Sequence, residues 1–194
     1  MIHPRLIFTV LFLMTVSVVA DECHDTLFID SNAYPIPEWW CGWKIDSSDF
    51  ADPTKLVRLP AELCLDSGRI YVQSDTRSAL IEMAKRAERD SVFFTVKSGY
   101  RSPAYQRSLI KRRLDSGAVY TEVLKIVAPP GYSEHHTGRA LDLAIPDSPF
   151  YHSRTYQWLK THARDFGFVE TYPRSDSTVM HWEPWHWYYS GKKN

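Results

Sequence analysis

Residues 133–142 read Ser-Glu-His-His-Thr-Gly-Arg-Ala-Leu-Asp, and residues 183–186, further along the chain, read Glu-Pro-Trp-His. The two stretches supply imidazoles and carboxylates, which are common ligands of catalytic zinc ions. Such a site uses three protein ligands, leaves a fourth position to water, and needs a separate carboxylate to accept the proton of that water. His135, Asp142 and His186 can be the ligands and Glu183 the base, so the pattern predicts a zinc peptidase.

The residues around Asp142 favour a metal ligand over a purely structural carboxylate. Residues 140–145 alternate as in a strand, with Leu141 and Leu143 on one face and only small residues beside Asp142 on the other. A carboxylate buried in an apolar strand is costly unless it is paired or binds a metal. The adjacent imidazoles of His135 and His136 leave open, from the residues alone, which of them is the first ligand.

Pro184 lies between Glu183 and His186, fixes its own φ angle and disfavours a regular central strand. The two side chains can therefore turn into one cleft. The alternative, an exposed turn with an unrelated acid and histidine, is disfavoured by the upstream motif.

A third motif, Ser-Gly-Tyr-Arg-Ser over residues 98–102, is followed by Gln106. In its order of motifs (the arginine motif, then S-x-H-x-x-G-x-A-x-D, then E-x-W-H) the chain resembles the VanY-type D-alanyl-D-alanine carboxypeptidases between about Tyr71 and Gly191. The resemblance implies one Zn2+ per chain and these roles: ligands His135, Asp142 and His186, base Glu183, and catalytic and substrate-binding Arg101. It also implies that Gln106 and Ser133 help to hold the terminal carboxylate or the backbone of the substrate.

The chain departs from the family pattern directly after the last motif. The family usually follows its final Trp-His with an aromatic residue and then Arg, whereas this chain reads Trp187-Tyr188. The expected zinc ligands and base are untouched. The change therefore affects the expected substrate fit or local salt bridging rather than the chemistry.

The remaining periodicity predicts an α+β fold, a small antiparallel sheet with packed helices; the resemblance implies the zinc DD-peptidase or hedgehog-like fold. In the helix that starts at Ser102 and Pro103, Tyr105, Leu109 and Ile110 are expected to be buried. Helices are expected over residues 76–89, 103–115 and 156–166, and strands over residues 92–96, 140–145, 168–171 and 185–189.

The N-terminus has the pattern of a secretory signal. Arg5 precedes an apolar run that closes with small residues at Val18 and Ala20. We expect cleavage after Ala20 and a secreted or periplasmic protein, with an uncleaved anchor as the alternative. The predicted organisation is a signal peptide over residues 1–20, a Cys- and Trp-rich cap over residues 21–70, and a catalytic domain over residues 71–194.

The predicted cap contains all three cysteines, Cys23, Cys41 and Cys64, and none forms a C-x-x-C pair. In an exported chain they predict one disulfide, of which Cys41 with Cys64 is one possible pairing. The tryptophans of residues 39–43 can stack on sugar rings of a glycan, but large aromatic residues near a disulfide more often build a small satellite core.

The formal net charge is zero, which gives no basic field for nucleic acid or acidic membranes. With the resemblance, we expect a monomeric enzyme that removes terminal D-alanine from peptidoglycan stem peptides, without contact to nucleic acid or, in the mature form, to membrane. An L,D-carboxypeptidase or a phage-lysin-type endopeptidase would use the same zinc chemistry. A zinc-stabilised cell-wall-binding module is the rival from another class, but such a module has no need for Glu183.

Overall fold

The computed structural model describes residues 25–145, 149–172, 174 and 181–192. The expected signal segment and Cys23 lie outside these residues, so cleavage and export stay predictions. Within the described residues no helix is both long and apolar enough to cross a membrane.

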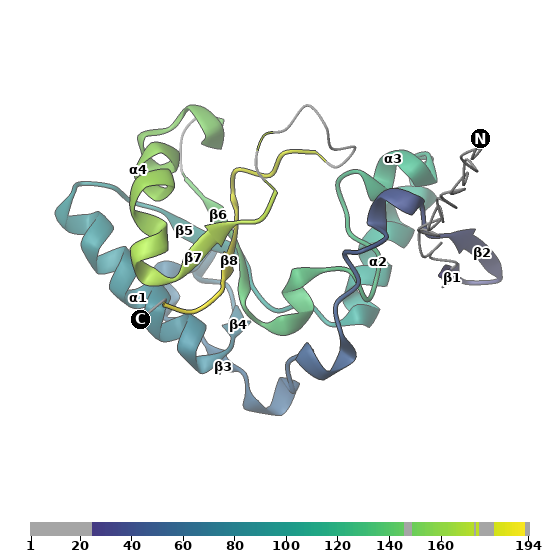
Figure 1. Ribbon diagram of the computed structural model, residues 1–194, viewed down its shortest axis with the longest axis horizontal. Helices are drawn as coiled ribbons and strands as arrows, with labels where there is room; N and C mark the ends of the chain where they lie inside the picture. The colour runs from purple at the N-terminus through teal and green to yellow at the C-terminus, as the bar shows by residue number, and fades with distance from the viewer. Residues whose placement is uncertain (1–24, 146–148, 173, 175–180, 193–194) are drawn as a thin grey trace, which may run out of the picture.

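A four-stranded antiparallel sheet organises the fold (Figure 1), as expected for the α+β class. Its strands lie in the order β5 (Thr95–Ser98), β6 (Ala140–Ala144), β8 (His186–Tyr189) and β7 (Phe168–Glu170). Asp142 on β6 is paired with Ser98 on one side and with His186 on the other. The register thus aligns the motifs of the sequence across neighbouring strands.

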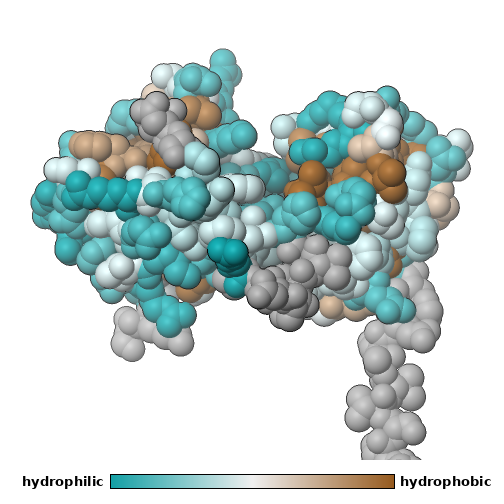
Figure 2. Space-filling view, turned by 90° about the horizontal axis from the view of Figure 1, so that it is seen from above, coloured by the Kyte–Doolittle hydropathy of each residue, from teal (hydrophilic) through white to brown (hydrophobic). Residues whose placement is uncertain are grey.

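The elements divide between two apolar cores, which we call the sheet lobe and the cap lobe. In the sheet lobe, α1 (Ser74–Arg89) and α4 (Arg154–His162) pack with the four-stranded sheet around residues such as Leu80, Met83 and Phe168. In the cap lobe, the hairpin of β1 (Thr26–Ile29) and β2 (Asn32–Pro35) packs with α2 (Pro103–Asp115) and α3 (Tyr120–Leu124). Seen from above, apolar areas lie on both lobes of a largely hydrophilic surface (Figure 2).

The segment predicted as a cap contributes to both lobes. Trp40 is buried in the cap lobe, whereas Leu59 and Cys64 are buried in the sheet lobe. The short strands β3 (Val57–Arg58) and β4 (Tyr71–Val72) pair with each other and lead into α1. The division of the chain into a cap and a catalytic domain stays a prediction.

Cys64 corrects one expectation about the disulfide. Its thiol is free and buried, and it donates to the carbonyl of Pro60 at 3.3 Å. A Cys41–Cys64 disulfide is therefore wrong. A bond between Cys41 and Cys23 stays a prediction, since Cys23 lies outside the described residues.

Two local expectations differ from the structure. The strand expected from Val92 begins only at Thr95, because Ser91 has a φ of 55° and the Val92 N–H closes the end of α1 on the carbonyl of Ala87 at 2.8 Å. In α2, Tyr105 is 50% exposed, while Gln106 and Ile110 are buried. Gln106 and Ile110 lie four residues apart, so they share one face of the helix, and this face packs against the core. Tyr105 therefore points outward.

Candidate active site

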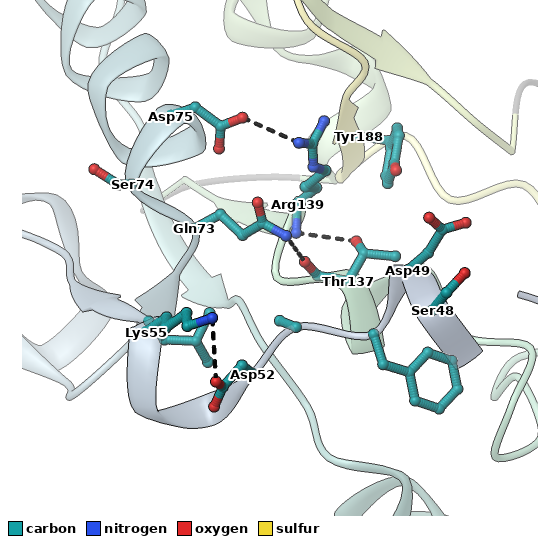
Figure 3. Close-up of a pocket in the computed structure, with 13 residues that line it drawn as sticks. Ser48, Asp49, Asp52, Lys55, Gln73, Ser74, Asp75, Thr137, Arg139 and Tyr188 are labelled. Atoms are coloured by element: carbon teal, nitrogen blue, oxygen red, sulfur yellow. Dashed lines mark hydrogen bonds and ion pairs between the residues drawn. The ribbon is translucent and has the colours of Figure 1, made fainter. Parts of the chain in front are cut away.

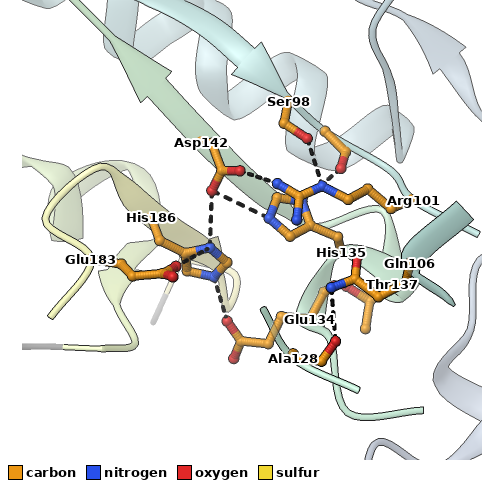
Figure 4. A network of polar contacts seen from close by, with 11 residues as sticks. Ser98, Arg101, Gln106, Ala128, Glu134, His135, Thr137, Asp142, Glu183 and His186 are labelled. Atoms are coloured by element: carbon orange, nitrogen blue, oxygen red, sulfur yellow. Dashed lines mark hydrogen bonds and ion pairs between the residues drawn. The ribbon is translucent and has the colours of Figure 1, made fainter. Parts of the chain in front are cut away.

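His135, Asp142 and His186 come together from three elements, as the sequence predicts (Figure 4). His135 belongs to a short 3-10 turn over residues 134–137, Asp142 to β6 and His186 to β8. The Oδ1 atom of Asp142 lies 3.3 Å from Nε2 of His135 and 3.2 Å from Nδ1 of His186. All three residues are buried, and one candidate ligand atom from each lies within 4.8 Å of the others.

Gly138 lets the chain turn sharply between the 3-10 turn and β6. Its φ of 68° lies in the left-handed region, which favours glycine. A Cβ atom at this position would also lie 2.9 Å from Cδ2 of Leu56. The glycine of the second motif therefore allows His135 and Asp142, on either side of the turn, to face the same point.

A backbone carbonyl fixes the orientation of the His135 ring. Nδ1 lies 2.6 Å from the carbonyl oxygen of Gly99, which can only accept, so Nδ1 carries the proton and donates. Nε2 is left with its lone pair toward Asp142, and burial lowers the pKa of His135 to about 4. A neutral imidazole held by its second nitrogen is the form in which histidine binds metals. This donor set of two imidazoles and a carboxylate fits zinc.

The contacts of His136 favour its neighbour His135 as the candidate metal ligand, the choice that the sequence left open. Its Nδ1 donates to the carbonyl of Arg101 at 2.7 Å, and its Nε2 accepts from the N–H of Gly131 at 3.1 Å. Both ring nitrogens are therefore used by the backbone. The ring holds the loop before His135 against the segment that carries Arg101.

Two carboxylates flank His186 on different sides of its ring. Oε2 of Glu183 lies 3.9 Å from Nδ1, the nitrogen that faces Asp142, whereas Oε2 of Glu134 lies 2.9 Å from Nε2. Glu183 reaches this place because the chain turns at Pro184, where the His186 N–H donates to the carbonyl of Glu183 at 2.9 Å. Burial raises the pKa of Glu183 to about 7. Of the two, Glu183 is on the side of the candidate metal site.

Arg101 contacts the carboxylate oxygen of Asp142 that the two histidines do not use. Its Nη2 forms an ion pair with Oδ2 of Asp142, and its Nε donates to Oγ of Ser98 at 2.8 Å. The side chain is 18% exposed. Oδ1 of Asp142 thus faces the imidazoles while Oδ2 is held by the guanidinium, and these contacts hold the pKa of Asp142 well below its usual value despite burial.

Gln106 and Ser133 line the same pocket as Arg101, His135, Glu183 and His186. Gln106 is 1% exposed, and its Nε2 donates to the carbonyl of Ala128 at 2.9 Å. Its Oε1 is buried and has no hydrogen-bond partner among the described residues. A buried acceptor without a partner on the wall of a pocket is suited to accept an N–H from a ligand.

Aromatic residues of the cap lobe and of the segment after β7 form another wall, which the sequence did not predict. Trp40 and Tyr172 line the pocket, and Trp43 stacks on Tyr172 with ring centres 5.5 Å apart. Tyr172 in turn meets the edge of the His186 ring at 5.0 Å. Burial, with the nearby carboxylates of the site, raises the pKa of the Tyr172 phenol, so it stays protonated.

Tyr188, at which the chain departs from the family pattern, lines a second, separate hollow of about 770 Å³ (Figure 3). Tyr188 lines it together with Arg139, which forms an ion pair with Asp75 at 3.1 Å. In the sheet register Tyr188 pairs with Ala140, the neighbour of Arg139. An arginine of this chain thus lies beside the position where the family arginine is missing, and none of the candidate zinc ligands lines this hollow.

Comparison with known proteins finds relatives of one family. Residues 69–192 match the family model VanY: D-alanyl-D-alanine carboxypeptidase. A D-alanyl-D-alanine carboxypeptidase of Enterococcus faecium is 32% identical over 168 residues, which are 85% of this chain and 51% of the relative. A second, from Enterococcus faecalis, is 30% identical over 122 residues, 58% of this chain and 46% of the relative. The chain therefore spans about half the length of these curated relatives.

Solved structures give the same fold. The LdcB LD-carboxypeptidase matches with a TM-score of 0.65 and 29% identity over 75% of this chain and 72% of that chain. VanYB in complex with D-alanine-D-alanine matches with a TM-score of 0.59 and 27% identity over 76% of this chain and 82% of that chain. A VanY D,D-pentapeptidase in complex with Zn(II) matches with a TM-score of 0.53 and 28% identity over 69% of this chain and 83% of that chain. The chain belongs to the VanY family of D-alanyl-D-alanine carboxypeptidases.

Proposed function

We propose that this protein is an exported, zinc-dependent D-alanyl-D-alanine carboxypeptidase that removes the terminal D-alanine of peptidoglycan stem peptides. The observation that carries the proposal is the buried cluster of His135, Asp142 and His186, with Glu183 on the same side of the His186 ring at 3.9 Å. A binding module needs the ligands alone. The additional, partly buried carboxylate of Glu183 is what hydrolysis requires, since it could accept the proton of a zinc-bound water.

His135 through Nε2, Asp142 through Oδ1 and His186 through Nδ1 would hold one zinc ion. When bound, zinc supplies a water with a pKa near 7 and polarises the scissile carbonyl. Glu183 accepts the proton of the attacking water and later gives it to the leaving amine of D-alanine, so the peptide bond is replaced by a carboxylate and a free amine. A pKa near 7 suits a group that both accepts and returns a proton.

Arg101 binds the substrate with the guanidinium nitrogens that its contacts to Asp142 and Ser98 leave available. A planar, fixed guanidinium matches a terminal carboxylate or the oxyanion of the tetrahedral intermediate. Gln106 and Ser133 line the pocket and hold the peptide backbone of the substrate. For Gln106, the unpartnered Oε1 supports a contact to a substrate N–H rather than to its carboxylate.

We further propose that the enzyme acts as a monomer outside the cytoplasmic membrane. Its partner is then the stem peptide alone, without nucleic acid or lipid. The N-terminal sequence pattern and the balanced charge support this location.

An L,D-carboxypeptidase is the second candidate, since the LdcB LD-carboxypeptidase has a similar fold. Both activities require a free terminal carboxylate but different stem lengths. An endopeptidase would instead cut inside the stem, and the zinc ligands do not distinguish among the three.

Defined stem peptides test the proposal. Purified zinc-loaded protein is incubated with a pentapeptide ending in D-alanyl-D-alanine, the same peptide as its C-terminal amide, and a tetrapeptide, and the products are weighed by mass spectrometry. We expect loss of one alanine from the free pentapeptide and much slower cleavage of the amide, because donors built for a carboxylate are left unpaired. Cleavage of the tetrapeptide alone would favour the second candidate, and equal cleavage of acid and amide would contradict both.

A further inference from the structure

The two ring nitrogens of His186 are hydrogen-bonded to two carboxylates, of which only Asp142 belongs to the candidate ligand set. Asp142 faces Nδ1 at 3.2 Å and Glu134 faces Nε2 at 2.9 Å. We propose that Glu134 is a positioning residue: it accepts the Nε2–H of His186 and thereby presents the Nδ1 lone pair to the zinc ion. This inference rests on the proposed zinc site. It assigns a role to Glu134, which occupies a variable position (x) of the motif S-x-H-x-x-G-x-A-x-D.

Nε2 of His186 contacts Glu134 in a buried environment. His186 is 2% exposed, and the Glu134 side chain is 14% exposed, so water is largely excluded from their contact. The other groups that face the ring are Asp142 and Glu183 on the Nδ1 side and the rings of His135 and Tyr172, which meet it at 80° and 60°. Among the described residues, Glu134 is the one hydrogen-bond partner of Nε2.

An imidazole can bind a metal through either nitrogen, and the hydrogen bond at the other nitrogen decides which one is free. A carboxylate at Nε2 fixes the proton there and increases the basicity of Nδ1 as a ligand. In His135 the roles of the two ring nitrogens are reversed. Its Nδ1 donates to the carbonyl of Gly99, and its Nε2 faces Asp142. The two histidines are thus oriented by different acceptors, one on the backbone and one on a side chain.

The 3-10 turn gives Glu134 a fixed position. Its carbonyl accepts from Oγ1 of Thr137 at 2.6 Å, and the His136 N–H donates to the carbonyl of Ser133 at 3.0 Å. One turn therefore supplies both a ligand, His135, and the group that orients a second ligand on β8. Glu134 is too far around the ring to be the base, because it faces the nitrogen turned away from Asp142.

The test measures zinc binding rather than turnover. Full-length protein is stripped of metal, and its zinc Kd is determined by competition with a chelating indicator for the wild type, Glu134→Ala, Glu134→Gln and the exposed control Glu122→Gln. We expect Glu134→Ala to weaken zinc binding about 10- to 100-fold, the usual effect of losing such an outer partner. Glu134→Gln should weaken it less, since its amide oxygen can still accept the Nε2–H, and Glu122→Gln should bind as the wild type.

A second readout follows the proton itself. In 15N-labelled, zinc-loaded wild type, the Nε2–H of His186 should give a slowly exchanging proton resonance that shifts in Glu134→Gln. Wild-type Kd values in both Glu134 variants would overturn the inference, and an unchanged resonance in Glu134→Gln would overturn it even if Glu134→Ala fails to fold. Failure of the wild type to bind zinc would instead overturn the proposed zinc site.

Discussion

Raising the pH should destabilise the metal-free protein, because its folded state holds His186 protonated. Burial by itself lowers the pKa of His186, but the hydrogen bonds to Asp142 and Glu134 outweigh burial and raise the pKa to about 10. A group whose pKa is raised on folding stabilises the folded state below its unfolded pKa and loses that contribution as the pH rises through its folded pKa. The contribution is therefore complete below about pH 6.5 and lost by about pH 10.

The size of the effect follows from the same values. A rise of the pKa from 6.5 to about 10 corresponds to a contribution of about 5 kcal/mol. Between pH 7 and pH 9 the unfolded chain binds about one proton fewer at this residue, so the free energy of unfolding should fall by about 1.4 kcal/mol per pH unit. Glu183, with a pKa raised to about 7, adds to this slope near pH 7 but is almost fully ionised by about pH 8, so the slope between pH 8 and pH 9 reports on His186.

Urea unfolding of chelator-treated protein at pH 7, 8 and 9, followed by tryptophan fluorescence, measures this slope. The matched variant His186→Asn, which cannot take up the proton, should lose it. Zinc-loaded wild type should lose it as well, because the metal replaces the proton at Nδ1. A free energy of unfolding that stays constant from pH 7 to pH 9 in the metal-free wild type would refute the reasoning.

Three substitutions test the roles of Glu183, Arg101 and Gly99. Glu183→Gln should keep zinc and fold but lose turnover by about 10²- to 10⁴-fold, since the amide cannot accept a proton; turnover near that of the wild type would remove Glu183 from the mechanism. Arg101→Lys should raise KM for the free pentapeptide, because a point charge cannot reproduce the planar guanidinium contacts; an unchanged KM would make Arg101 a structural residue. Gly99→Ala should lower the free energy of unfolding by about 1–3 kcal/mol, because its Cβ would lie 2.7–2.9 Å from three atoms of residues 70–72. Urea unfolding checks this against Gly68→Ala, whose Cβ would meet its nearest atom at 3.2 Å; equal loss in both would argue against the overpacking.

The convergence of the candidate ligands could be predicted because it depends on short-range patterns. The alternation around Asp142 predicts β6, and the structure adds a turn at Gly138 before it. The strand register that joins Asp142 to His186 follows from burying Leu141 and Trp187 on one face. Periodicity likewise predicts α1 and α2 to within two residues at their starts.

The missed features depend on contacts between segments that are far apart in the chain. Glu134 occupies a variable position of its motif, so the motif predicts no role for it. Its role depends on β8, which places Nε2 of His186 2.9 Å from Oε2 of Glu134. The tryptophans of residues 39–43 carry no periodic signal, yet Trp40 donates to the carbonyl of Leu124 at 3.1 Å and Trp43 reaches Tyr172. The satellite-core reading of these tryptophans is confirmed for Trp40, which is 3% exposed in the cap lobe.

Restoring zinc to the metal-free protein while measuring free D-alanine tests directly whether the protein is a zinc-dependent carboxypeptidase. Protein stripped of metal is titrated with zinc in the presence of a pentapeptide that ends in D-alanyl-D-alanine, and released D-alanine is quantified at each step. We predict no release without zinc, a rate that rises in proportion to added zinc, and a plateau at one zinc per chain. Full release by the metal-free protein, or no release at any zinc concentration, would contradict the claim.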